Sequence, residues 1–333
     1  MKNKNKVLSV DNLFIEFLNR KGNLQAIRGV SFDMYQGEIL GVVGESGAGK
    51  SLTGSAITGL LEEPGRIKSG AIYCKGKRID NLPESERRLL RGKEIAAIFQ
   101  DPLTSLNPVL TIEEQLVETI QTHLPLSYTE AQTKAIDLMK EVGIPAPEER
   151  IRQYPHQFSG GMRQRIVIAL ALCVDPAIII ADEPTTALDV SVQSQVLQLL
   201  KRLCKQHNAS VMLVTHDMGV IAEVCDRVAV LYAGELIEIG QVSDIIKNPQ
   251  HPYTRGLMDS IPKIGQTRGR LYQIPGSMPR PNELPQGCKF HPRCEKSSIE
   301  CTQQTPTLKP SARSEVACFN TVIELEEVQQ HEF

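Results

Sequence analysis

A glycine-rich segment near the start of the chain has the composition of a phosphate-binding loop. It reads Gly44-Glu45-Ser46-Gly47-Ala48-Gly49-Lys50-Ser51, which is glycine, four residues and then Gly-Lys-Ser. Glycines let backbone N–H groups curl around phosphate oxygens, and a following helix adds a partial positive charge. In this pattern Lys50 reaches the terminal phosphates, and the Ser51 hydroxyl is placed to bind Mg²⁺. The alternative is a glycine-rich turn before an ordinary helix.

Two adjacent carboxylates follow a short apolar run farther along the chain. The run covers 177–181 and ends in Asp182-Glu183. At the end of a buried strand, Asp182 is expected to hold Mg²⁺, directly or through water. Glu183 is then the candidate general base that orients and polarises an attacking water molecule. Taken alone, the pair would be an exposed acidic strand end, but with the phosphate loop upstream it indicates a site for phosphate-bond hydrolysis.

These motifs need strands and helices to position them, and the sequence predicts both. Residues 8–17 and 25–34 are partly alternating and β-branched or aromatic, so they predict two strands with a turn. The other expected strands are 38–43, 177–181, 210–214 and 228–232, and the expected helices are 52–61, 112–122, 129–142, 162–173 and 191–207. Strands that alternate with helices predict a largely parallel α/β sheet. The stretch 103–157 is interpreted as a helical insertion, and the Pro-rich part after Gly240 as a loop-rich region.

Composition limits the classes of protein that the chain can represent. The 333 residues are 41% hydrophobic and carry a formal charge of −2, so no general attraction to nucleic acid is expected. The longest apolar runs fall far below the roughly 20 residues that cross a bilayer. The N-terminus lacks the apolar centre of a secretory signal, which predicts a cytosolic chain. In that compartment the eight cysteines are not expected to form structural disulfides.

The two motifs also fit kinases, GTPases, helicases and recombinases, and a third segment separates these classes. It reads Phe158-Ser159-Gly160-Gly161-Met162-Arg163-Gln164 and resembles the signature sequence of ATP-binding-cassette proteins, with Phe158 where Leu is commoner. Ser159 and the amides of Gly160 and Gly161 lie at the start of an expected helix, so they can face phosphate. In that family this loop closes over the nucleotide held by the partner's phosphate loop. Without the family, Ser-Gly-Gly would be a capped helix start.

Further motifs of the family follow in the expected order. By resemblance, Gln100 senses the γ-phosphate and Mg²⁺ at the edge of the helical insertion, and His216 contacts the γ-phosphate. The segment Ala187-Leu188-Asp189 matches the loop that crosses the dimer interface. Phe17 is the expected aromatic that stacks on adenine, with a core-facing strand residue as the alternative.

The resemblance implies an ATPase with ATP and Mg²⁺ as cofactors. Its catalytic residues would be Glu183, His216 and Gln100, and its Mg²⁺ ligands Ser51, Gln100 and Asp182. The expected nucleotide-binding residues are Phe17, Gly44, Glu45, Ser46, Gly47, Ala48, Gly49, Lys50, Ser51, Gln100, Ser159, Gly160, Gly161 and Asp182.

The chain beyond Gly240 matches a narrower pattern. The segments 251–254, 274–276 and 287–294 are similar to the C-terminal extension of oligopeptide and dipeptide importer ATPases. This similarity narrows the expected substrate class to peptides. Nickel, another metal chelate and a glutathione-like compound remain alternative substrates.

Four cysteines crowd this tail, Cys288, Cys294, Cys301 and Cys318, with five, six and sixteen residues between them. Four thiolates bind either zinc or an iron–sulfur cluster, and zinc sites favour ligands roughly two to four residues apart. Members of the importer branch with four tail cysteines hold an iron–sulfur cluster. The resemblance therefore implies a [4Fe-4S] cluster, with zinc as the alternative and free or disulfide-linked thiols after it.

The expected fold is α/β, with a RecA-like P-loop ATPase core, an antiparallel β subdomain, a helical subdomain insertion and a loop-rich C-terminal extension. The nucleotide-binding domain is expected at 1–240, with the helical subdomain at about 101–160, and the extension at 241–333. A second, usually different cassette subunit, two transmembrane permease subunits and an external peptide-binding protein are the implied partners. The chain would lie at the cytoplasmic face of the membrane.

A cassette protein of DNA repair, chromosome structure or translation is the competing class. Such proteins typically need a long coiled-coil insertion or two cassettes, and this sequence has one cassette and no sustained heptads. No nucleic-acid partner is therefore expected.

Overall fold

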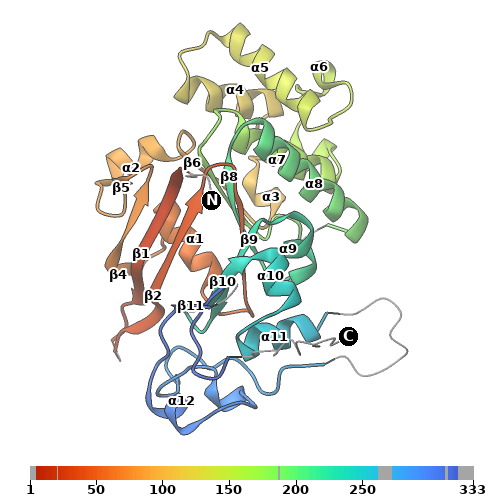
Figure 1. Cartoon of the computed structure of the whole chain (residues 1–333). Helices are drawn as coiled ribbons and strands as arrows, with labels where there is room; N and C mark the ends of the chain where they lie inside the picture. The colour runs from red at the N-terminus through yellow and green to blue at the C-terminus, as the bar shows by residue number, and fades with distance from the viewer. Residues whose placement is uncertain (1–4, 21, 187, 262–271, 312–313, 322–333) are drawn as a thin grey trace, which may run out of the picture.

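The chain folds around two β-sheets (Figure 1). The structure is a computed structural model that describes residues 5–20, 22–186, 188–261, 272–311 and 314–321. The smaller sheet is antiparallel, with strand order β2-β1-β4-β5. Its strands are β1 (Lys6–Phe17), β2 (Leu24–Tyr35), β4 (Gly65–Cys74) and β5 (Lys77–Arg78). The two strands predicted at 8–17 and 25–34 are confirmed as β1 and β2.

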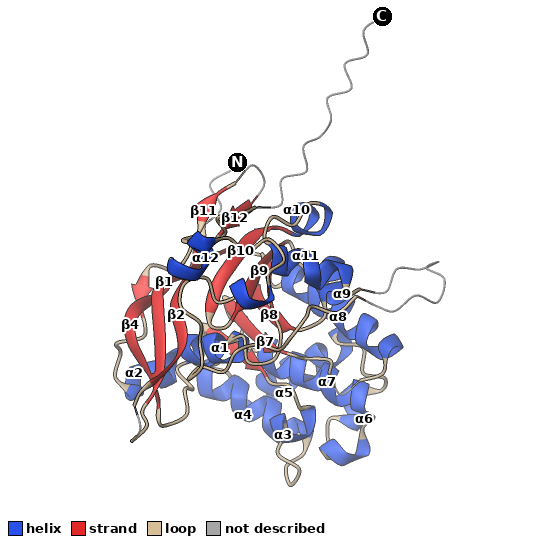
Figure 2. Cartoon of the chain, turned by 90° about the horizontal axis from the view of Figure 1, so that it is seen from below, coloured by secondary structure: helices blue, strands red, loops and turns tan. Residues whose placement is uncertain are grey.

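The larger sheet has the strand order β11-β12-β10-β9-β3-β8-β7-β6. Figure 2 labels β11, β12, β10, β9, β8 and β7 of this sheet. Its strands are β3 (Ile39–Val43), β6 (Ile95–Ile98), β7 (Ile178–Asp182), β8 (Ser210–Thr215), β9 (Arg227–Tyr232), β10 (Glu235–Gln241), β11 (Lys309–Pro310) and β12 (Ser314–Val316). The five strands from β9 to β6 pair in parallel, and β10, β12 and β11 continue antiparallel. This confirms the predicted, largely parallel sheet.

Alternation along β7 divides the apolar core between the two faces of this sheet. Ile178 and Ile180 pack with α1 (Lys50–Thr58) and the antiparallel sheet. Ile179 and Ala181 pack on the opposite face with the helices α7 (Gly160–Leu172) and α8 (Val190–Gln206). Because both faces are covered, the strand is apolar at every buried position, and its carboxyl end is fixed between the layers.

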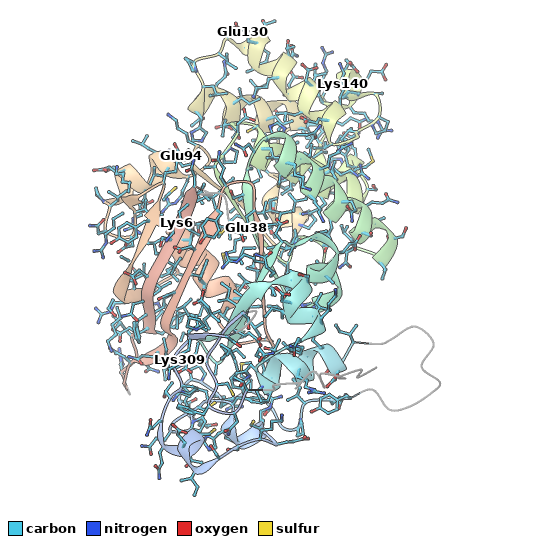
Figure 3. The ribbon with its side chains drawn as sticks, in the orientation of Figure 1. Lys6, Glu38, Glu94, Glu130, Lys140 and Lys309 are labelled. Carbon is cyan, nitrogen blue, oxygen red and sulfur yellow. The ribbon has the colours of Figure 1, made fainter. Side chains whose placement is uncertain are left out.

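A group of helices packs around α7, and its members α4, α5 and α6 lie at the top of Figure 1. It contains α3 (Pro102–Ser105), α4 (Ile112–His123), α5 (Tyr128–Glu141), α6 (Pro147–Arg150) and the 3₁₀ turn η1 (Pro155–Gln157). Reciprocal caps start its two long helices, Thr111 with Glu114 on α4 and Ser127 with Glu130 on α5, where Figure 3 labels Glu130. The two helices predicted in this stretch are thus confirmed. The remaining helices of the core are α2 (Glu84–Leu90) and α9 (Met218–Val224).

The C-terminal region follows β10, and its helices α11 and α12 lie at the bottom of Figure 1, opposite α4, α5 and α6. It contains α10 (Val242–Lys247), α11 (Pro252–Asp259), η2 (His291–Arg293) and α12 (Ile299–Gln303). Its apolar centre joins Tyr232 of β9 to Tyr253 and Phe290 in edge contacts, with ring centroids 4.7 to 5.4 Å apart. Among the described residues, no helix combines the length and the apolar character needed to cross a membrane.

A buried carboxylate fastens this region to the larger sheet. Glu238 of β10 is 0% exposed and accepts hydrogen bonds from the backbone amides of Gln250 and His251 at 2.8 and 3.0 Å. The hydroxyl of Ser314 on β12 donates a third, at 3.1 Å. Burial raises the pKa of Glu238, and these hydrogen bonds oppose that shift. The C-terminal region therefore continues the core sheet.

Replacing this carboxylate should weaken the whole attachment. Glu238→Ala leaves two buried amides and a hydroxyl without their acceptor, at about 1 to 3 kcal/mol for each orphaned group. We expect the free energy of unfolding to fall by about 3 kcal/mol in urea titrations followed by circular dichroism. The exposed Glu315→Ala on β12 is the matched control and should change it little. Equal stabilities for the two variants would contradict this role of Glu238.

Candidate functional site

The predicted phosphate loop connects β3 to α1, and its glycines are required by the backbone. Gly49, which caps α1, has a φ of 100°, in the left-handed region that favours glycine. A Cβ atom at Gly49 would also collide with the side chain of Ile27. A Cβ atom at Gly44 would collide with the carbonyl oxygen of Leu231 in β9. The loop therefore fits closely between the two sheets and leads directly into the helix N-terminus.

Lys50 lies folded over this loop. Its side chain is buried, and the ammonium donates to the carbonyl oxygens of Gly44 at 2.8 Å and Glu45 at 3.2 Å. Burial lowers the pKa of Lys50, whereas the carboxylates of Glu183, Asp182 and Glu45 act in the opposite direction. The cation is therefore held at the centre of the loop, where an anionic ligand would meet it.

Ser51 and Asp182, the two residues expected to bind Mg²⁺, come together from separate elements. The Ser51 hydroxyl at the start of α1 donates to Oδ1 of Asp182 at the end of β7, at 3.0 Å. Burial raises the pKa of Asp182, and the hydrogen bond from Ser51 opposes that shift. A hydroxyl next to a carboxylate supplies the hard oxygen ligands that Mg²⁺ prefers.

Glu183 lies at the junction of three side chains. Its Oε1 is 3.0 Å from Nδ1 of His216, and its Oε2 accepts from Thr186 at 2.9 Å and from Gln100 at 3.4 Å. Burial raises the pKa of Glu183, but the bonds from His216 and Thr186 and the nearby positive charges together outweigh it and leave the pKa lowered. Its φ of 45° is uncommon for a residue other than glycine, and such strain concentrates at functional sites. An ionised, oriented carboxylate can accept a proton from water.

The predicted catalytic residues emerge from neighbouring strands. Gln100 follows β6, Glu183 follows β7 and His216 follows β8, and all three strands run parallel. Because the carboxyl ends of parallel strands share one edge, the structure brings these side chains together beside the phosphate loop. The side chain of His216 is 60% exposed, so it is open to a ligand.

The signature segment lies next to the start of α8. Ser159 caps α7, accepting from the amide of Met162 at 3.4 Å, and Gly160 and Gly161 begin the helix. A Cβ atom on Gly161 would come within 2.7 Å of the Val192 side chain. Of the expected dimer-interface loop, Leu188 and Asp189 are described, and Ala187 lies outside the described residues.

Phe17 lies at the end of β1, opposite Leu24 of β2 and Gly65 of β4. Its half-buried ring packs beside Gly65. Stacking of this ring on adenine stays a prediction.

Three contacts of the site were not anticipated. Thr186 donates to Glu183, and only its place three residues after that carboxylate could have suggested it. From the C-terminal region, Tyr253 and Arg293 both contact Glu45 of the phosphate loop. These pairs are 208 and 248 residues apart in sequence, so no local pattern announces them.

The four tail cysteines line one small cavity, together with His251 and Phe290. They are free thiols, and Cys301 receives polar contacts from the hydroxyl of Ser298 at 3.3 Å and the amide of Asn320 at 3.6 Å. Burial raises the pKa of Cys288 to about 11 and that of Cys318 to about 12. Within the described ranges, no group of three or more His, Cys, Asp or Glu side chains is arranged to hold a metal ion. The geometry by itself thus supports neither an iron–sulfur cluster nor zinc.

Two family profiles match the chain. Residues 27–186 match the ABC transporter family, and residues 237–301 match the C-terminal region of oligopeptide/dipeptide transporters. The first match covers the phosphate loop, the signature segment and Glu183. The second covers Tyr253, Arg293 and three of the four tail cysteines.

Curated relatives are similar over almost the whole chain. A dipeptide transport ATP-binding protein of Bacillus subtilis is 49% identical over 90% of this chain and 90% of its own length. An oligopeptide transport ATP-binding protein of Salmonella typhimurium is 43% identical over 96% of each chain.

Among solved structures, an ATP-binding cassette determined as a dimer in a post-hydrolysis state with ADP and phosphate is similar, with a TM-score of 0.63. The two chains are 28% identical, and the match covers 71% of this chain and 98% of that one. The chain therefore belongs to the ABC transporter family, as an ATPase of the branch that carries the oligopeptide/dipeptide transporter C-terminal region.

Proposed function

We propose that this chain hydrolyses ATP with Mg²⁺ to power the import of oligopeptides or dipeptides. The observation that carries the proposal is that one chain has both a phosphate loop joined to the Asp182-Glu183 pair through Ser51 and a match to the peptide-transporter C-terminal region. The names of the relatives, which are peptide transport ATP-binding proteins, support the substrate class.

In this proposal the residues that follow the parallel strands have separate roles in binding and hydrolysing ATP. Lys50 and the loop amides bind the phosphates, and Ser51, Asp182 and Gln100 hold Mg²⁺. Glu183 polarises the attacking water, with Thr186 and His216 orienting its carboxylate. His216 also contacts the γ-phosphate, and Phe17 stacks on adenine. Two hydrogen bonds support these roles: the bond from Ser51 to Asp182 brings two oxygen atoms for Mg²⁺ together, and the bond from Thr186 to Glu183 orients the base.

The chain acts in an assembly. A second, paralogous cassette presents its phosphate loop to Ser159, Gly160 and Gly161, and the two cassettes lie at the cytoplasmic face beneath two permease subunits. An external binding protein delivers the peptide. The exposure of Ser159 and Gly160 supports this arrangement, since backbone amides at a helix start attract phosphate. We assign residues 1–240 to the nucleotide-binding domain, with its helical part at about 101–160, and 241–333 to the peptide-importer extension.

The cysteine cavity is proposed to hold a [4Fe-4S] cluster, with zinc as the alternative. The proposal rests on the resemblance of the four-cysteine tail to that of the importer branch and on the place of these cysteines around one cavity, not on a preformed metal site among the described residues. Each cysteine of a four-iron cluster binds a different iron atom, so its ligands stand farther apart than those around a single ion. When bound, the cluster would supply a structural or redox-linked centre, and this chain's own part is to provide four thiolates away from the ATP chemistry.

Removing the loop cation should weaken nucleotide binding itself. Lys50→Ala deletes a charge-assisted contact worth about 1.5 to 3 kcal/mol, so we expect the ATP dissociation constant to rise at least about tenfold. Isothermal titration calorimetry of the full chain measures it, with the exposed Lys77→Ala as control. Unchanged affinity in Lys50→Ala would remove this residue from the phosphate site.

Removing the base should stop turnover and leave ATP bound. Glu183→Gln keeps the side-chain size, and loss of a general base lowers the rate by about 100-fold or more. We expect the transporter, reconstituted with its partner cassette and permeases, to trap ATP and to stop ATP-driven uptake of labelled peptide. The exposed Glu62→Gln is the control.

The same vesicles test the substrate class. Uptake of a nickel chelate or of glutathione in place of di- and oligopeptides would contradict the peptide assignment. Wild-type ATP turnover at the site of a Glu183→Gln subunit would contradict the assignment of Glu183 as the general base.

Anaerobic purification tests the cysteine centre. We expect a brown protein with about four irons per chain, and Cys294→Ser should lose the absorption and the iron. Cys74→Ser is the matched control, since Cys74 lies in the β1–β4 sheet and should not affect the colour. A colourless protein with stoichiometric zinc and no iron would contradict the cluster and support zinc as the bound metal.

A further inference from the structure

One buried arginine of the C-terminal region reaches the phosphate loop. Arg293 of η2 has a side chain only 7% exposed, and its guanidinium pairs with the Glu45 carboxylate at 3.1 Å. Its Nε donates to the carbonyl oxygen of Pro275 at 2.7 Å, and the group also lies over the ring of Tyr232. A cation in such an enclosed place needs a negative partner, and Glu45 provides one.

A second residue of the same region holds the backbone of Glu45. This residue is Tyr253, which is fully buried. The backbone amide of Glu45 donates a hydrogen bond to the Tyr253 hydroxyl at 2.9 Å. The carbonyl oxygen of Glu45 accepts from Lys50 at 3.2 Å and from the amide of Ala48 at 3.1 Å. Glu45 is therefore fixed at its amide, its carbonyl and its carboxylate, and two of these three points belong to the C-terminal region.

The charge of Glu45 is unfavourable for the function of the loop. A carboxylate one residue into a phosphate-binding loop repels an anionic triphosphate, and partial burial strengthens that repulsion. The side chain of Glu45 is 30% exposed, so solvent screens it incompletely. The Arg293 guanidinium offsets this charge and at the same time restricts where the carboxylate can point.

We propose that Arg293 is a positioning residue for ATP, which acts by neutralising and holding Glu45, and that Tyr253 supports it by fixing the Glu45 amide. The C-terminal region is thereby part of the nucleotide site. This inference rests on the proposed binding of ATP at the phosphate loop.

A rescue experiment separates this role from simple packing. For the full chain with Arg293→Ala, we expect the dissociation constant of the Mg²⁺ complex of ATPγS to rise about tenfold, measured by titration calorimetry. Glu45→Gln in the same chain should restore most of the affinity, because it removes the uncompensated carboxylate. A loss caused only by missing packing would not recover.

Conservative and control variants complete the set. Arg293→Lys keeps the charge and should keep most of the affinity, and Tyr253→Phe should raise the dissociation constant about threefold by orphaning the Glu45 amide. Arg280→Ala, an exposed arginine of the same region, should leave it unchanged. If circular dichroism shows that Arg293→Ala does not fold, Arg293→Gln replaces it, with the same loss and the same rescue expected.

The outcomes are distinct. Wild-type affinity in the Arg293 variant, or equal loss with and without Glu45→Gln, overturns the positioning role and leaves the proposed function intact. Failure of the wild-type chain to bind the nucleotide overturns the proposed function and this inference with it.

Discussion

The site depends on the parallel register of four neighbouring strands, β3, β8, β7 and β6. Val43 lies opposite Thr215, and Asp182 lies opposite Val214, so the strands β3, β8 and β7 end at the same level. The residues that follow each strand therefore emerge at one edge, where the phosphate loop, Glu183 and His216 meet. A slip of one residue would turn alternate side chains to the opposite face and separate them.

This edge concentrates opposing charges within a partly buried volume. Lys50 is the buried cation, and the carboxylates of Glu45, Asp182 and Glu183 all act on its pKa. Burial raises the pKa of both carboxylates at the end of β7, but at Glu183 the hydrogen bonds from His216 and Thr186 and the nearby positive charges together outweigh it, so the pKa of Glu183 is lowered. A lowered pKa keeps Glu183 ionised, as a base requires, whereas Asp182 gains most from a nearby divalent cation.

The strands and the phosphate loop could be predicted because local sequence patterns determine them. Partly alternating runs predicted β1 and β2, which bury only some of their positions. Continuous apolar runs predicted β7, β8 and β9, because both faces of the larger sheet are covered. The phosphate loop was visible because Gly44 and Gly49 are required by the backbone itself. By contrast, β12 has three residues, too few for a periodicity, and the Arg293–Glu45 pair joins positions 248 residues apart. The role proposed for Ser159 involves a second subunit, so the contacts within one chain do not test it.

The two sides of the site differ in the strength of their contacts: one has buried polar contacts and the other an exposed hydrogen bond. The C-terminal region is bound to the sheet by buried Glu238 and to the phosphate loop by Arg293 and Tyr253, so it cannot move relative to the loop without breaking enclosed polar contacts. On the other side, Gln100 reaches Glu183 through an exposed hydrogen bond at 3.4 Å, a length at which such bonds are weak. The phosphate loop is therefore the fixed part of the site, and the Gln100 side is where small displacements cost least.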